Sequence, residues 1–186
     1  MEQTKLSLVQ PRGIWIWLKL YRLYVAAFPP AERKPFRIIF WNYCRGKNDL
    51  WCLYRDDRFA GFASMVNGCD RVLLDYFVVK QALRGQGIGS EALKALQEIY
   101  RDTGLFVEIE SAYEPGDDQL LRQKRKQFYE RAGMVPMKIM ANVFGVKMEL
   151  LGWNCEMTYD QYWNFYRAYL SPWAEEHVSE EIHPEA

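Results

Sequence analysis

The chain has 186 residues, 49% of them hydrophobic and 26% charged, which fits one domain with a buried core and excludes a disordered, collagen-like or low-complexity chain. Its 24 basic residues balance 24 acidic ones, so the usual electrostatic reason to expect bulk nucleic-acid binding is absent. Lys19 and Arg22 interrupt the aromatic stretch at 14–28, so no apolar run approaches the ~20 residues of a membrane-spanning helix, and we expect neither a nucleic acid nor a membrane as partner.

The first half of the chain predicts one helix and several antiparallel strands. A short strand pattern at 5–8 precedes a helix at 15–28, whose apolar residues recur at three- and four-residue steps until Pro29. The following segment, 29–36, is expected to be an exposed loop. Three strand-like runs come next, at 50–55, 59–66 and 71–79. They are separated by turn-forming pairs, Asp56-Asp57 and Asn67-Gly68, and such short connections require antiparallel pairing.

Helices and strands alternate in the middle of the chain. An apolar helical stripe at 92–100 ends near Gly104, which is typical of a C-terminal cap, and a strand is expected at 105–110. A polar stretch then leads into a second helix at 118–132, which Gly133 closes in the same capping role.

The last part of the chain predicts a hairpin, a helix and a tail. The runs 135–140 and 143–151 are expected to pair about Ala141-Asn142. A capping-box pattern begins a helix at 158–170, and the acidic tail at 175–186 is expected to be disordered. Antiparallel strands followed by a β-α-β-α-β-β series indicate an α/β domain with a mixed sheet.

The segment 74–90 points most directly to a chemical function, because a strand, a glycine-rich loop and a helix start follow one another there. Gly85, Gly87 and Gly89 allow successive backbone N–H groups to point at an anion, and the helix N-terminus adds roughly half a positive charge. Arg84 supplies further donors beside them. We therefore predict a phosphate site, with a purely structural glycine-rich turn as the alternative.

Two familiar phosphate motifs fit this segment poorly. A Walker loop requires a lysine after the glycines, and none is present. A dinucleotide fingerprint requires glycine at position 90, where Ser90 stands, although Glu108 and Glu110 lie about 20 residues further on, as that fingerprint also asks. A nucleotide-dependent oxidoreductase is therefore a distant alternative.

A third pattern matches better. Residues 84–89, R-G-Q-G-I-G, fit the R/Q-x-x-G-x-G/A signature of the GNAT superfamily of N-acetyltransferases, and residues 128–134, F-Y-E-R-A-G-M, resemble the F-Y-x-x-x-G-F element on that family's next helix. The resemblance spans 75–134 and implies a GNAT-like α/β fold, in which helices flank a mixed, mostly antiparallel sheet. We expect a single domain over 1–174 that includes the extra C-terminal helix.

In the GNAT superfamily, acetyl coenzyme A lies between the fourth and fifth strands, and its pantetheine pairs with the backbone of the fourth. The resemblance implies that the pantetheine binds at 77–79, the pyrophosphate on the amides of 84–89, and no metal takes part. The implied coenzyme-binding residues are Phe77, Val78, Val79, Arg84, Gly85, Gln86, Gly87, Ile88, Gly89, Ser90 and Arg122.

Arg122 marks a departure from the family, because many relatives carry an asparagine there to bind pantetheine. It begins a basic run with Lys124, Arg125 and Lys126. A solvated helix face is the plainer interpretation of this run. The alternative is that one or two of the cations contact coenzyme phosphates or an anionic acceptor.

The resemblance also implies a reaction, in which acetyl passes from acetyl coenzyme A directly to a primary amine in a ternary complex. Tyr129 matches the tyrosine that many family members use as the general acid toward the leaving thiolate. A carboxylate is expected to take the proton of the amine. Asp75 is preferred, and Glu108 and Glu110 are the alternatives.

Other features restrict the remaining possibilities. The four cysteines lack C-x-x-C spacing and no apolar leader precedes them, which predicts reduced thiols in a cytoplasmic protein. The only histidines, His177 and His183, lie in the acidic tail, which disfavours metal catalysis. The acceptor is expected to be a small-molecule or peptide amine, and a homodimer is left open. The main alternative function is a coenzyme A-binding regulatory module without turnover.

Overall fold

The computed structural model describes residues 5–68, 70–169 and 176–184. The chain divides into two compact units. The first unit comprises 1–67 and 74–99, and the second comprises 68–73 and 100–186.

The first unit contains four strands and three α-helices. They are β1 (Leu6–Val9), α1 (Ile14–Ala27), α2 (Phe36–Cys44), β2 (Asn48–Arg55), β3 (Arg58–Asn67), most of β4 (Val72–Val79) and α3 (Ile88–Ile99). Single 3-10 turns occur at Pro30–Glu32 and Gln81–Leu83. Strands β1, β2 and β3 pair antiparallel, and the β2–β3 turn is Asp56-Asp57, as predicted, with both residues at positive φ.

The second unit contains the start of β4, four further strands and two α-helices. They are β5 (Leu105–Glu110), α4 (Gln119–Arg131), β6 (Val135–Val143), β7 (Val146–Trp153), α5 (Tyr159–Tyr169) and β8 (Val178–Glu181). The predicted capping box at the start of α5 is confirmed. The Thr158 hydroxyl accepts from the Gln161 amide at 3.3 Å, and the Gln161 side chain accepts from the Thr158 amide at 2.9 Å.

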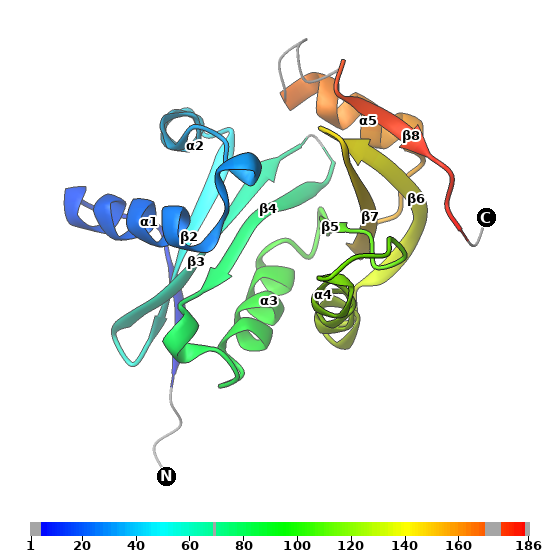
Figure 1. Cartoon of the computed structure of the whole chain (residues 1–186). Helices are drawn as coiled ribbons and strands as arrows, with labels where there is room; N and C mark the ends of the chain where they lie inside the picture. Colours follow the sequence, from blue (N-terminus) through cyan, green and yellow to red (C-terminus); the bar gives the residue numbers. More distant parts are fainter. Residues whose placement is uncertain (1–4, 69, 170–175, 185–186) are drawn as a thin grey trace. The chain divides into compact units, whose positions relative to one another are not determined.

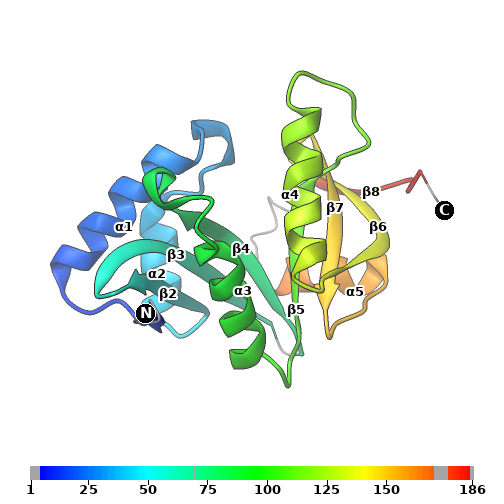
Figure 2. The same cartoon turned by 90° about the horizontal axis from the view of Figure 1, so that it is seen from below.

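Among the described residues, the strands form one eight-stranded sheet in the order β1-β2-β3-β4-β5-β7-β6-β8 (Figures 1 and 2). Only β4 and β5 pair in parallel, and the other registers that the structure resolves are antiparallel. This confirms the predicted α/β fold with a mixed, mostly antiparallel sheet, flanking helices and an extra C-terminal helix.

Helices cover both faces of the sheet in the first unit. Buried residues of α1 and α2 pack with Tyr76 and Val78 of β4, whereas Ile88 and Ala92 of α3 pack against the face that includes Phe77. Alternation along β4 therefore directs successive side chains to different layers. The backbone of 77–79, where coenzyme contacts are expected, is held between two apolar layers.

Helix α2 was not predicted, and it begins at the last residue of the expected loop at 29–36. Its sequence is rich in aromatic and β-branched residues, which are modest helix formers, and Pro35 at its start makes no side-chain cap. Tertiary packing stabilises the helix instead, because Trp17 of α1 contacts the rings of Phe40 and Tyr43 at centroid distances of 4.8 and 5.4 Å.

The turn of the β6–β7 hairpin lies three residues beyond its predicted position. Ala141 and Asn142 are paired strand residues, and the turn is Phe144-Gly145, with φ of +52° and +85°. Positive φ at both positions is the geometry that two-residue hairpin turns require. Asn142 supports the turn from within the strand, since its side-chain oxygen accepts from the Gly145 amide at 2.8 Å.

The described part of the acidic tail, 176–184, is ordered, whereas disorder was expected over 175–186; residues 175, 185 and 186 lie outside the described residues. Val178–Glu181 forms β8, which pairs antiparallel with β6 over four residues. His183 is buried and makes an edge contact with Tyr113 at 5.7 Å between ring centroids. The prediction of disorder rested on the acidic composition of the tail. Composition carries no information about the backbone hydrogen bonds that the open edge of β6 offers to a further strand.

Candidate active site

The connection from β4 to α3 carries the glycine-rich signature. Gly85 and Gly87 have φ of +76° and +78°, in the left-handed region that favours glycine. A Cβ atom at Gly85 would meet no atom within 4 Å, so backbone conformation, not lack of space, selects glycine there. The residues from Arg84 to Gly87 are exposed, whereas Ile88, which begins α3, is buried.

The start of α3 leaves a row of backbone donors. The first amide with a backbone acceptor is that of Glu91, which donates to the Gly87 carbonyl oxygen at 3.0 Å. In the described part of the chain, the amides of 85–90 have no backbone acceptor. Arg84 Nε donates to the Val79 carbonyl oxygen at 3.2 Å, which holds this cation at the end of β4. These amides, the helix dipole and the guanidinium can together bind a phosphate.

The charge of Glu91 would oppose a bound anion, because its carboxylate lies in the first turn of α3. Arg55 of β2 compensates for it, with a guanidinium nitrogen 2.8 Å from Glu91 Oε1. The ion pair offsets the negative charge of Glu91, so the partial positive charges of the amides dominate the electrostatic potential at this position.

The edge of β4 is paired with β5 over only a short stretch. Val72 pairs with Leu105 and Leu73 with Phe106, and the pairing stops there. The rest of β4 leads directly to the glycine-rich connection. Its backbone could therefore pair with an extended ligand on the side away from β3.

Asp75 forms an ion pair that the sequence did not predict. Its Oδ1 lies 2.7 Å from Lys34 Nζ, and the exposed fractions of the two side chains are 10% and 37%. Two buried tyrosines fix the backbone of the lysine, because Tyr24 donates to the Lys34 carbonyl oxygen at 2.9 Å and Tyr76 accepts from the Lys34 amide at 3.1 Å. Burial, followed by the nearby Asp75 carboxylate, raises the pKa of Tyr76 to about 12.

Tyr129 lies near the end of α4 and is buried, with an exposed fraction of 7%. Its hydroxyl makes no hydrogen bond with any described residue. Burial raises its pKa to about 12, although Arg125 acts in the opposite direction. The phenol therefore keeps its proton at neutral pH, which is the state that a general acid requires.

The two carboxylates of β5 bind other side chains of the second unit. Glu108 accepts from the hydroxyls of Tyr162 and Tyr166, both at 2.9 Å, and so attaches α5 to the sheet. Glu110 accepts from Arg125 of α4 at 3.4 Å. Burial, with Glu108 as the next cause, raises the pKa of Tyr162 well above its usual value, so this tyrosine is a stable donor to Glu108.

The basic run on α4 makes contacts within its own unit. Arg122 donates to the Glu114 carbonyl oxygen at 2.9 Å and lies 3.1 Å from Asp118 Oδ1, which ties the start of the helix to the loop before it. Lys124 is exposed. The sequence favoured a solvent-exposed helix face for the whole basic run. This holds for Lys124 but not for Arg122, whose side chain is mostly covered.

A buried ion pair between α4 and β7 was missed. Glu149, with an exposed side-chain fraction of 1%, accepts from Lys126 Nζ at 2.5 Å and from the Ala112 amide at 2.6 Å. Burial alone would lower the pKa of Lys126, but the hydrogen bond to Glu149 and its charge, with help from Tyr113, raise it. The available signal was a single carboxylate among the apolar residues of the β7 pattern.

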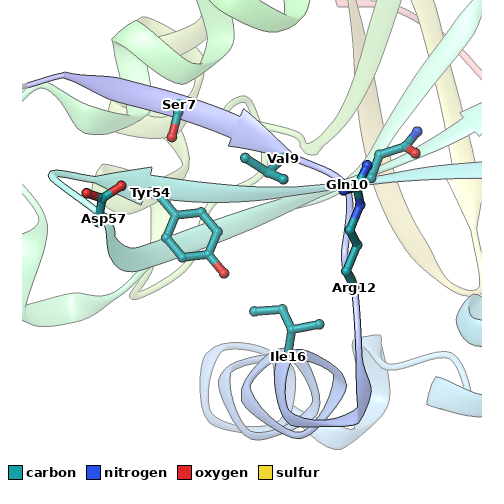
Figure 3. A pocket seen from close by; sticks show the side chains of 7 residues that line it. All are labelled: Ser7, Val9, Gln10, Arg12, Ile16, Tyr54 and Asp57. Carbon is teal, nitrogen blue, oxygen red and sulfur yellow. The ribbon is translucent and has the colours of Figure 1, made fainter.

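The hollow shown in Figure 3 lies apart from the residues predicted for the site. It has a volume of about 280 Å³ in the first unit, and Ile16 of α1 and Tyr54 of β2 point into it. No group of three or more His, Cys, Asp or Glu side chains within the described ranges could hold a metal ion. None of the helices in the described part of the chain is long and apolar enough to cross a bilayer.

Solved structures share this fold. The chain is similar to a protein from Bacteroides thetaiotaomicron assigned to the GNAT family, at 18% identity and a TM-score of 0.71, covering 89% of this chain and 98% of that one. A GNAT acetyltransferase from Elizabethkingia anophelis with acetyl-CoA bound has 14% identity, a TM-score of 0.59 and coverages of 83% and 100%. The ribosomal-protein-S18-alanine N-acetyltransferase of Escherichia coli is 15% identical, with a TM-score of 0.59, and the match covers 84% of this chain and 97% of that one.

No curated protein sequence matches the chain significantly. The model of the acetyltransferase (GNAT) family, in contrast, matches residues 17–134. This match covers more than half of the chain and includes both the glycine-rich connection and Tyr129. The chain therefore belongs to the GNAT family of acetyltransferases.

Proposed function

We propose that the protein is an N-acetyltransferase that moves acetyl from acetyl coenzyme A to a primary amine by direct transfer in a ternary complex. The observation that carries this proposal is the row of unpaired amides between Gly85 and Ser90, beside Arg84 and at the start of α3. Family membership and the acetyl-CoA bound in the E. anophelis structure support the choice of coenzyme.

Most of the proposed coenzyme contacts are made by backbone groups of β4 and of the glycine-rich connection. In this proposal the pantetheine pairs with 77–79 of β4, and its pyrophosphate binds the amides of Gly85, Gln86, Gly87, Ile88, Gly89 and Ser90. The Arg84 amide donates instead to the Gln81 carbonyl oxygen at 3.2 Å, so this residue is proposed to act through its guanidinium. Arg122 is proposed to act at the coenzyme in place of the family's asparagine. Its present contacts with Glu114 and Asp118 hold it at the start of α4.

Two proton transfers complete the proposed reaction. Asp75 takes a proton from the attacking amine, directly or through water, so that the nitrogen lone pair can bond to the thioester carbon. Tyr129 gives its phenolic proton to the sulfur as the carbon–sulfur bond breaks. Lys34 holds the Asp75 carboxylate in place until an acceptor arrives.

Replacing Gly87 by valine is expected to abolish stabilisation by acetyl coenzyme A. A ligand at 100 times its dissociation constant adds ~2.7 kcal/mol to the native state, which raises the melting temperature by several degrees. Valine disfavours the φ of +78° at this position and disturbs the amides. Gly46→Val is the matched control, because Gly46 has a φ of +69° and lies at the end of α2. A Gly87 variant that keeps the full thermal shift would refute the phosphate site.

Replacing Asp75 by asparagine is expected to reduce turnover more at neutral pH than at high pH, where free amine is abundant without a base. Lys34→Met separates this effect from loss of the ion pair, since it removes the partner and keeps the carboxylate. The measurement is thiol release against pH for both variants. An unchanged profile in Asp75→Asn would transfer the role to Glu108, Glu110 or water. Coenzyme binding without turnover on any amine would favour the regulatory module instead.

A further inference from the structure

The segment that runs from the start of α1 through α2 to the turn after α2 is strongly basic, whereas the chain as a whole is neutral. Residues 14–47 contain seven basic residues and one acidic residue, a net charge of +6 in a chain whose net charge is zero. Lys34 is paired with Asp75. The other six cations form no ion pair with another described residue: Lys19, Arg22, Arg33, Arg37, Arg45 and Lys47.

Helix α1 is apolar on two sides. Ile16, Leu20 and Tyr24 are buried against the sheet. A second stripe at steps of four, three and four residues stays exposed, with fractions of 67% for Ile14, 41% for Leu18, 49% for Tyr21 and 38% for Val25. A helix that is apolar on both sides is typical of one that a second partner covers.

Two tryptophans extend this stripe. Trp15 of α1 and Trp41 of α2 have exposed fractions of 76% and 55%. Helices α1 and α2 are neighbours in the first unit (Figure 1). Trp17 of α1 contacts the rings of Phe40 and Tyr43 of α2. Tryptophan and arginine are enriched at the energetic centres of protein interfaces. The exposed apolar residues and the six cations are here called the α1–α2 surface.

The α1–α2 surface is joined to the proposed base within one unit. The segment between the helices carries Lys34, which binds Asp75 of β4. Tyr24 of α1 and Tyr76 of β4 hold that segment through hydrogen bonds of 2.9 and 3.1 Å to the Lys34 backbone. These contacts hold the segment between α1 and α2 against the Asp75 carboxylate within the first unit.

We infer that the α1–α2 surface binds an acidic polypeptide and presents an amine of that polypeptide for acetylation. The inference rests on the proposed function and adds the class of acceptor. The six cations that form no ion pair with another described residue favour an anionic occupant, and the exposed aliphatic and tryptophan side chains favour one that also carries apolar groups. A nucleic acid is anionic, but its bases offer no basic alkyl amine. A second copy docked face to face would bring two cationic surfaces together.

The inference predicts charge selectivity in the acceptor. Three short peptides with a free N-terminal alanine are compared, in which leucine alternates with glutamate, glutamine or arginine. We expect kcat/KM for the glutamate peptide to exceed that for the arginine peptide at least tenfold at low salt, and this preference to fall as salt screens the charges. Arginine is used because lysine would add acceptor amines. Equal values, or a preference for arginine, would overturn the inference.

Variants locate the effect on the surface. Arg22→Glu and Arg37→Glu are expected to weaken binding of the N-acetylated, fluorescently labelled glutamate peptide about tenfold each, measured by anisotropy. Trp15→Ser is expected to weaken it at least tenfold, as for an interface centre. Lys138→Glu on β6 is the matched control and leaves binding unchanged. Because the labelled peptide cannot be acetylated at its N-terminus, this measurement stands even if no transfer is detected.

The outcomes separate the acceptor class from the proposed function. Acetylation of amines without charge preference would overturn the inference and leave the proposed function intact. Charge-dependent peptide binding without acetyl transfer would support the surface and contradict the proposed function. Anionic lipid vesicles or single-stranded DNA that bind in place of the glutamate peptide, or a dimer that Trp15→Ser dissociates in sedimentation, would overturn the inference.

Discussion

Tyr129→Phe is expected to lower turnover about 100-fold while leaving acetyl coenzyme A binding intact. Positioned proton transfer contributes about 10²- to 10⁴-fold, and the lower end applies because a thiolate is a fairly good leaving group. The pKa of Tyr129 is raised to about 12 by burial, so its phenol stays protonated below pH ~10, where a free tyrosine begins to ionise. The loss should therefore be constant from neutral pH to that limit, measured as thiol release with a true acceptor at saturating coenzyme.

The same substitution distinguishes catalysis from packing. The Tyr129 hydroxyl makes no hydrogen bond within the described ranges, so phenylalanine should change the free energy of unfolding very little. Tyr54→Phe in the first unit is the matched control and should keep normal turnover. If Tyr129→Phe stays within about threefold of the parent, the tyrosine is a packing residue.

Lys126→Met is expected to lower the free energy of unfolding by ~3 kcal/mol, because it leaves the carboxylate of Glu149 buried without its cation. The lower end of the usual range applies, since the Lys126 side chain keeps an exposed fraction of 15%. Urea unfolding should show a lower midpoint at an unchanged slope. Because Lys126 and Tyr129 lie on α4 one turn apart, turnover should also fall as the helix loosens.

Two further variants isolate the buried pair. Adding Glu149→Gln to Lys126→Met removes the uncompensated charge and keeps an oxygen for the Ala112 amide, so most of the lost stability should return. Lys147→Met breaks an ion pair with Glu114 that is largely exposed, and it should change stability little. Equal losses in Lys126→Met and Lys147→Met would show that burial of Glu149 does not govern the pair.

Local patterns predicted those parts of the site that depend on neighbouring residues. The strand, the glycines at 85 and 87 and the start of α3 form one continuous segment, so their spacing determines their geometry. The partner of Asp75 could not be predicted in this way, because Lys34 lies 41 residues earlier in the chain. The tyrosine donors to Glu108 are more than 50 residues away from it, on a helix whose position only tertiary packing determines.

The errors in the fold have a common physical basis. Helix α2 has few strong helix formers and is held by ring contacts with α1, which lies too far away in the sequence for a local pattern to include it. The β6–β7 turn was placed on Asn142 because asparagine favours turns, whereas Asn142 acts from the strand and Gly145 takes the positive φ. Strand β8 depends on hydrogen bonds to β6, not on its own polar composition.

The two outermost strands of the sheet affect how readily the protein can aggregate through its sheet edges. Strands β1 and β8 occupy the ends of the strand order, and each is only four residues long. Long, flat, uncharged edges can recruit strands from other molecules and begin aggregation. Strand β8 is short, pairs with the last four of the nine residues of β6, and includes Glu180 and Glu181. The glutamates of β8 are therefore expected to oppose the pairing of this edge with strands of other molecules.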